Sequence, residues 1–116
     1  IHQIEMLVSV MGTGAEKLLV FGNDAQKTVI VKYDDGRCAS LIYSDSLDFS
    51  VNIKLNEEKP FNSGISSDYF KLMLLDIMNF FNTGKTPFDT KQTLEVIAIR
   101  DAVIKGVSET ENWINI

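Results

Sequence analysis

The 116-residue chain is long enough for one domain with a real core, and its 45% hydrophobic and 23% charged residues are ordinary for a globular protein. The net charge of −5, with the basic residues scattered singly, argues against binding to nucleic acid or to a membrane surface. No apolar run approaches the roughly 20 residues that cross a bilayer. The one cysteine, Cys38, cannot form an internal disulfide, so we expect a reducing, cytoplasmic compartment.

The first predicted element is a helix over residues 1–11. Five apolar residues recur there at helical spacing: Ile1, Ile4, Leu7, Val8 and Met11. Gly12 and Gly14 are expected to end this helix. No capping Ser, Thr, Asp or Asn precedes Ile1, so we expect that the parent protein has further chain upstream.

Residues 16–55 predict a meander of four strands. The segments 16–22 and 27–34 are rich in β-branched and aromatic residues, with "NDAQ" as the turn between them. Asp35-Gly36 predicts a tight hairpin into a third strand over 37–44. In residues 47–55 apolar and polar residues alternate strictly, which predicts a fourth strand with one buried and one polar face.

The second half predicts a loop over 56–66 and two helices. The first helix is capped by Ser66 or Ser67, has Asp68 in its first turn, runs to about Asn82 and must be covered on most of its circumference. Gly84 and Pro87 end it. A capping box, Asp89 to Gln92, opens the last helix, which runs to about Lys105 and ends at Gly106. Its expected inner face is Leu94, Ile97, Ala98, Val103 and Ile104.

Residues 113–116 close the chain as a short strand. The predicted fold class is therefore α+β, with helices packed on one face of a mainly antiparallel sheet, in a single domain over residues 1–116.

The sequence offers little catalytic chemistry. The glycines of "MGTGAEK" lie between a helix and a strand, in the reverse order to a dinucleotide phosphate loop, and indicate a turn. One His and one Cys cannot form the usual zinc sites, Asp34-Asp35 is interpreted as a solvated turn, and Cys38 as a buried core residue. His2 is the one plausible acid/base group at neutral pH; the alternative is a helix histidine near a frayed terminus.

Nearly the whole chain resembles the C-terminal part of the Gfo/Idh/MocA family of NAD(P)-dependent oxidoreductases. The stretch from Phe70 to Ile116 is similar to the family's helix ending in G-x-x-P, its following helix with a small Ala, then a Ser, then a last strand. The matching residues are Gly84, Pro87, Leu94, Ala102 and Ser108. "IHQIEMLVSVMGTGAEKLLVF" resembles the family's helix after the catalytic His, and "VKYDDGRCASLIYS" resembles its hairpin around "DGR".

The resemblance implies a substrate-binding and oligomerisation domain, with the Rossmann domain absent from this chain. NAD or NADP would be bound by that missing domain, and the substrate of the parent dehydrogenase would be a sugar, cyclitol or similar polyol. His2 matches the His of the family's D-x-x-x-H motif, whose Asp would lie upstream of this chain, while Gln3 departs from the usual Gly. A homo-oligomer through the sheet is implied, and the fragment alone is expected to be inert.

Two further points bear on this expectation. Glu58-Lys59-Pro60 reads as the family's E-K-P motif but follows His2 instead of preceding it, so Lys59 is interpreted as a solvated loop lysine.

The alternative function is a stand-alone, non-catalytic α+β module that binds or dimerises. In that case the fourth strand's polar face and exposed residues such as Ile30 would pair sheet to sheet.

Overall fold

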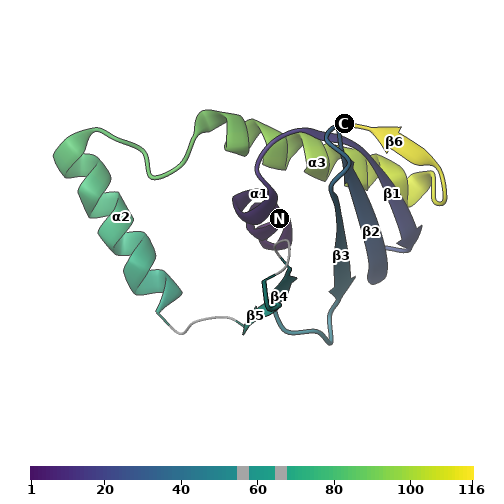
Figure 1. The fold of residues 1–116 in the computed structure, drawn as a ribbon, viewed down its shortest axis with the longest axis horizontal. Coiled ribbons are helices and arrows are strands. Elements are labelled where there is room, and N and C mark those ends of the chain that lie inside the picture. The colour runs from purple at the N-terminus through teal and green to yellow at the C-terminus, as the bar shows by residue number, and fades with distance from the viewer. Residues whose placement is uncertain (55–57, 65–67) are drawn as a thin grey trace. The chain divides into compact units, whose positions relative to one another are not determined.

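The computed structural model describes residues 1–54, 58–64 and 68–116. The chain divides into two compact units, which we call unit 1 (Ile1–Leu47 with Thr90–Ile116) and unit 2 (Asp48–Asp89). Unit 1 contains α1 (His2–Met11), β1 (Ala15–Gly22), β2 (Gln26–Tyr33), β3 (Cys38–Ser44), α3 (Thr90–Ser108) and β6 (Trp113–Asn115) (Figure 1). Unit 2 contains β4 (Ser50–Ile53), β5 (Phe61–Gly64) and α2 (Tyr69–Thr83). The helices and antiparallel strands confirm the α+β class, whereas the single domain over 1–116 stays a prediction.

The sheet of unit 1 has four antiparallel strands in the order β3-β2-β1-β6. The turn between β1 and β2 is held by the Asn23 carboxamide oxygen, which accepts the backbone N–H of Ala25 at 3.0 Å and of Gln26 at 3.2 Å. At the next turn the Asp35 carboxylate accepts the backbone N–H of Arg37 at 3.0 Å, and Gly36 takes a positive φ of 89°. The first helix, the first three strands, their turns and the closing strand are therefore confirmed.

Helices α1 and α3 pack on one face of this sheet. Alternate sheet residues point towards the helices and are buried: Leu18, Val20, Val29, Val31, Tyr33 and Ile114. The helices contribute Ile4, Leu7, Val8, Val96, Ile99 and Ala102. Each large side chain buried in this way stabilises the fold by about 1.5–3 kcal/mol.

Helix α3 differs from the prediction in length and in the face that it buries. It continues through Gly106 to Ser108, and its buried residues are Val96, Ile99, Ala102 and Gly106. Of the predicted inner face, Leu94, Ile97 and Ile104 are exposed. The small residues explain the difference, because Ala102 and Gly106 let the helix axis come close to β1 and so fix its rotation.

The predicted fourth strand does not join the meander. Of its described residues only Ser50–Ile53 form a strand, β4, which pairs with β5 in a separate two-stranded hairpin, and β6 is the fourth strand of the main sheet. Strand β5 lies within the predicted loop over 56–66, which was therefore wrong in part. Leu47 and Phe49 are exposed rather than buried, and Leu55 lies outside the described residues. Alternation specifies which residues share a face, but it does not specify the partner strand.

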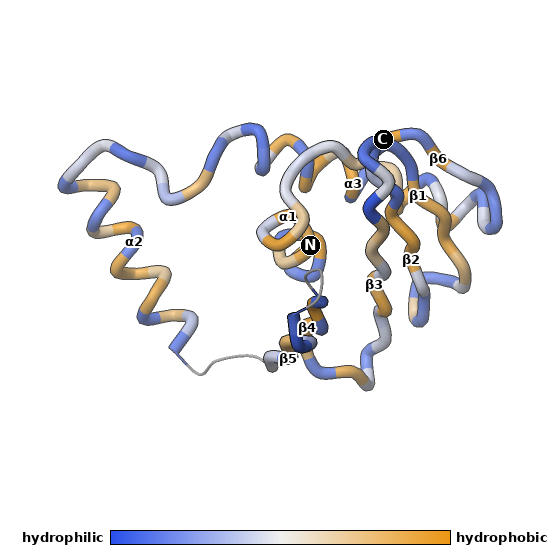
Figure 2. Tube along the Cα trace, in the orientation of Figure 1, coloured by the Kyte–Doolittle hydropathy of each residue, from blue (hydrophilic) through white to orange (hydrophobic). Residues whose placement is uncertain are grey.

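The C-terminal end of helix α2 lies where it was predicted. Its side chains are more exposed than predicted. Gly84 takes a left-handed conformation, and its N–H donates to the Phe80 carbonyl at 2.7 Å. Asp68 is the N-cap residue rather than part of the first turn, and Ser66 and Ser67 lie outside the described residues. No described side chain of α2 is buried, and apolar residues recur along its whole length (Figure 2).

Ionisation of Tyr33 is expected to lower the stability of the fold at high pH. Its side chain is fully buried, and its hydroxyl has no hydrogen-bond partner among the described residues. Burial first, and then the charge of Glu95, raise the pKa of Tyr33 from 10.0 to about 12. Because the folded state holds this proton more tightly, its stabilisation is complete below about pH 10. It is lost as pH rises to about 12, with a slope of up to about 1.4 kcal/mol per pH unit.

Tyr33→Phe is expected to remove this alkaline loss of stability. Thermal melts from about pH 9 to 12 measure the slope, and the exposed Tyr69→Phe serves as the matched control that keeps it. Below about pH 10 the variant should be at least as stable as the parent chain, because it buries no unpaired hydroxyl. Equal alkaline slopes in Tyr33→Phe and the parent chain would contradict this assignment.

Candidate functional site

His2 lies in the first turn of α1, and its side chain is 75% exposed. Its Nδ1 is 2.8 Å from Oε2 of Glu5, one helical turn further along. An Nδ1–H donated to this carboxylate favours the tautomer in which Nε2 carries the lone pair. The predicted acid/base residue is therefore accessible and oriented, and Glu5 is a neighbour that the sequence analysis did not assign.

The glycine turn after α1 does not fit the phosphates of a dinucleotide. The backbone N–H groups of Gly14 and Ala15 both donate to Oε1 of Glu95 in α3, at 3.0 and 2.6 Å. A carboxylate of the chain itself thus occupies the amides that would cradle a phosphate. The turn predicted from "MGTGAEK" is confirmed, and its function is to join α3 to the start of β1.

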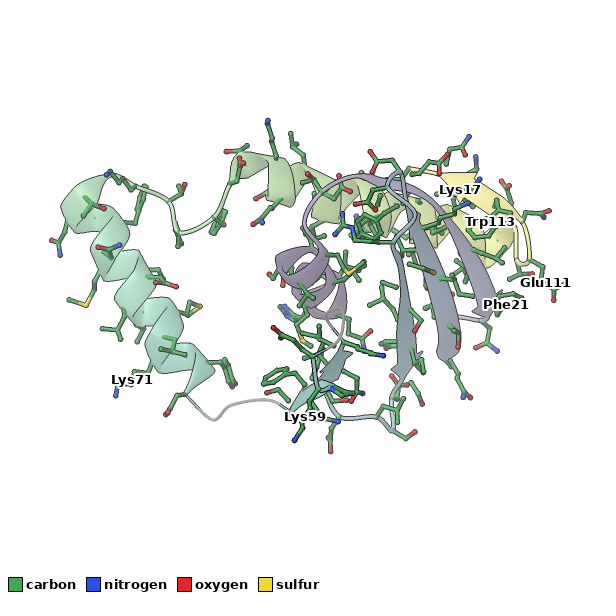
Figure 3. All side chains as sticks on the ribbon, viewed as in Figure 1. Lys17, Phe21, Lys59, Lys71, Glu111 and Trp113 are labelled. Carbon is green, nitrogen blue, oxygen red and sulfur yellow. The ribbon has the colours of Figure 1, made fainter. Side chains whose placement is uncertain are left out.

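The other sequence candidates behave as ordinary surface groups. Asp35 pairs with Arg37 through Nε and Oδ2 at 2.6 Å, and hydrogen bonds from Arg37 lower the pKa of the Asp35 carboxyl. Lys59 is exposed, in the segment just before β5 (Figure 3). Within the described ranges, His, Cys, Asp and Glu nowhere gather in a group of three that could hold a metal ion.

The prediction that Cys38 is a buried core residue is wrong. It begins β3 and is exposed, not buried, because it pairs with Lys32 on the face of the sheet that points away from the helices. The segment around it is a strand as expected, but the cysteine lies one residue out of phase with the half-buried, core-facing Ala39 and Leu41.

That face of the sheet, opposite to α1 and α3, is the largest candidate site of unit 1. We call it the outer sheet face and define it by Lys17, Leu19, Phe21, Thr28, Ile30, Lys32, Cys38, Ser40, Ile42, Trp113 and Asn115. Phe21, Ile42 and Trp113 are 40%, 57% and 49% exposed. Leu19 and Ile30 lie between them and are half-buried. Monomeric proteins rarely leave such a contiguous apolar patch uncovered, so this face is a candidate interaction surface.

The sequence contained a signal for this surface. Residues 18–21 and 29–31 are continuous apolar runs, which are typical of strands covered on both faces. Ile30 was predicted to be exposed at a sheet-to-sheet contact; it is half-buried near the centre of the outer sheet face. The fourth strand, also assigned to that contact, belongs to unit 2.

No family model, no curated protein and no solved structure matches this chain. In the described part of the chain, the helices are too short or too polar to span a bilayer.

Proposed function

We propose that this chain is the substrate-binding and oligomerisation domain of an NAD(P)-dependent oxidoreductase of the Gfo/Idh/MocA type. The observation that carries the proposal is the outer sheet face, an open apolar surface on a sheet whose other face is packed by α1 and α3. The resemblance implies this architecture, in which the sheet mediates assembly into a homo-oligomer. The order of α1, with His2 at its start, and then β1 supports the same proposal.

The proposed reaction oxidises a secondary alcohol of a sugar or cyclitol to a ketone. Removing a hydride from such a carbon releases the hydroxyl proton, and Nε2 of His2 is suited to accept it when Glu5 holds Nδ1–H. The glycine turn does not fit a dinucleotide phosphate, because Glu95 occupies its amides. The proposal therefore assigns NAD or NADP to a separate Rossmann domain of a cytoplasmic parent protein.

The isolated chain is expected to be inert. Incubated with NAD⁺ or NADP⁺ and a panel of polyols and sugars, it should produce no absorbance of reduced cofactor. In the parent protein, His2→Gln should lower kcat by about 10²–10⁴-fold, because a positioned acid/base group contributes that much. Gln3→Ala, next to it in α1, is the matched control and should leave kcat unchanged. Cofactor reduction by the isolated chain, or full activity of His2→Gln, would contradict the proposal.

A second candidate is a stand-alone, non-catalytic α+β module that dimerises or binds another protein. The outer sheet face favours it equally, because an open apolar sheet needs a partner whatever the chemistry next to it. The two candidates differ in what precedes Ile1 in the gene. A Rossmann domain of more than about a hundred residues supports the oxidoreductase, and an initiating methionine a few residues upstream supports the module.

A further inference from the structure

The register of the sheet divides the outer sheet face into three rows that run across the strands. The first row contains Asn115, Lys17, Lys32 and Cys38. The second row contains Trp113, Leu19, Ile30 and Ser40. The third row contains Phe21, Thr28 and Ile42, and Glu111 lies in the turn before β6, beside the end of β1. The rows are therefore basic, mainly apolar, and apolar with an acidic end.

The first row has an uncompensated positive charge. Lys17 and Lys32 are directly opposite on neighbouring strands, which is unfavourable for like charges. No salt bridge to either lysine is found among the described residues; Lys17 Nζ instead lies 5.5 Å from the centre of the Trp113 ring. In the turn between β2 and β3, the Asp35 carboxylate already pairs with Arg37. An acidic group from outside the chain would compensate these lysines.

The acidic end of the third row is fixed by the backbone. The Glu111 N–H donates to the Val20 carbonyl at 3.0 Å, which places Glu111 beside the end of β1 (Figure 3). Glu111 is also the one described non-glycine residue with a positive φ, 66°. The sheet thus carries basic groups at one end of these strands and has an acidic residue beside the other end.

We infer that two copies of this chain pack their outer sheet faces together with the strands of one copy antiparallel to those of the other. This inference rests on the proposed function, in which that face is the interface, and adds the orientation. A two-fold axis along the strands would place each row over the same row of the second copy. Lys17 would then lie over the lysines of the second copy. A two-fold axis across the strands places the first row over the third and the apolar second row over itself. Charge complementarity selects the second arrangement.

The selected arrangement makes each strand cover its own counterpart. Lys17 and Lys32 then lie over Phe21 and Thr28 of the second copy, with Lys17 one strand away from its Glu111, and Leu19 and Ile30 form the apolar centre with their own equivalents. Stacked sheets lie about 10 Å apart and cross at about −30°. Cys38, in the first row of β3, therefore lies over Ile42 in the third row of the second copy's β3.

Cys38 makes this orientation directly testable, because it is the one cysteine of the chain. A disulfide cannot form across the interface, since its Cα atoms must approach within about 7 Å whereas facing sheets lie about 10 Å apart. A short bis-maleimide reaches that far. In Ile42→Cys we expect it to join the introduced thiol to Cys38 of the second copy. Denaturing gel electrophoresis then detects the covalent dimers. The parent chain should stay uncoupled, because its two Cys38 thiols are offset by about 13 Å along the strands as well.

Asn115→Cys is the matched comparison for the opposite orientation. It is exposed in the first row on β6, so a two-fold axis along the strands would place it over Cys38 of the second copy. Ile42→Cys and Asn115→Cys both alter exposed side chains, and circular dichroism checks that each variant is folded. Coupling of Ile42→Cys alone supports the inference. Coupling of Asn115→Cys alone overturns the orientation and leaves the proposed interface standing.

The remaining outcomes separate the inference from the proposed function. A chain that sediments as a monomer overturns both. A chain that sediments as a dimer but couples through neither position overturns the outer sheet face as the interface. Charge reversal gives an independent readout: Lys17→Glu with Lys32→Glu should raise the dimer Kd about tenfold, and adding Glu111→Lys should restore at least about threefold of it. No restoration by Glu111→Lys would overturn the inferred pairing.

Discussion

Gly106→Ala is expected to lower the free energy of unfolding by about 2 kcal/mol, although alanine is the better helix former by about 1 kcal/mol. A Cβ at Gly106 would lie 2.5 Å from Cγ2 of Val20 and 3.3 Å from its Cβ. Val20 is fully buried in the centre of the sheet, so it cannot move aside. Either α3 shifts away from β1 or the core is strained. Urea unfolding followed by circular dichroism measures the loss.

Two further variants separate this clash from a general effect of alanine. Gly64→Ala is the matched control, because a Cβ there meets nothing within 4 Å, and its stability should be unchanged. Val20→Ala in the Gly106→Ala background should restore part of the loss, because it removes the contacting methyl groups. Strict additivity of the two substitutions would contradict the proposed contact between α3 and β1.

Ile30→Lys is expected to abolish self-association while the monomer stays folded. Ile30 is half-buried in the second row of the outer sheet face, so the interface would enclose one uncompensated ammonium from each copy. Burying such a charge costs several kcal/mol, which weakens the dimer by at least about 100-fold. Sedimentation velocity over a concentration series measures this effect.

Ile104→Lys is the matched control for Ile30→Lys. It makes the same chemical change at a side chain that is 56% exposed on α3, on the other side of the sheet. Its association should equal that of the parent chain. Loss of association in Ile104→Lys with retention in Ile30→Lys would place the interface on the helical face instead.

The sequence predicted the local elements of unit 1 well, because their signals are local. Gly12, Asn23 and Gly36 mark turns through backbone conformations and side-chain caps that operate within a few residues. The strand with the clearest alternation, over 47–55, was nevertheless given the wrong partner. Its partner, β5, has only four residues, and after Phe61 they are polar or small with little strand propensity, so the local signal for this strand is weak.

Features that depend on tertiary packing were predicted less well. The apolar residues of α3 support more than one inner face, and only the approach of Gly106 to Val20 selects the one observed. Cys38 was assigned to the core by residue type, whereas the sheet register places it outside. The contact between Glu95 and the glycine turn spans 80 residues of chain and has no local signal at all. His2 stays a prediction, now with Glu5 as its neighbour.

The central claim is that the outer sheet face joins copies of this chain, and sedimentation velocity of the unmodified chain tests it most directly. Leu19, Phe21 and Trp113 would otherwise remain an open apolar surface in water. We predict a dimer, or a larger assembly built from dimers, at concentrations of about 10 to 100 μM. A single monomeric species up to about 100 μM would contradict the claim.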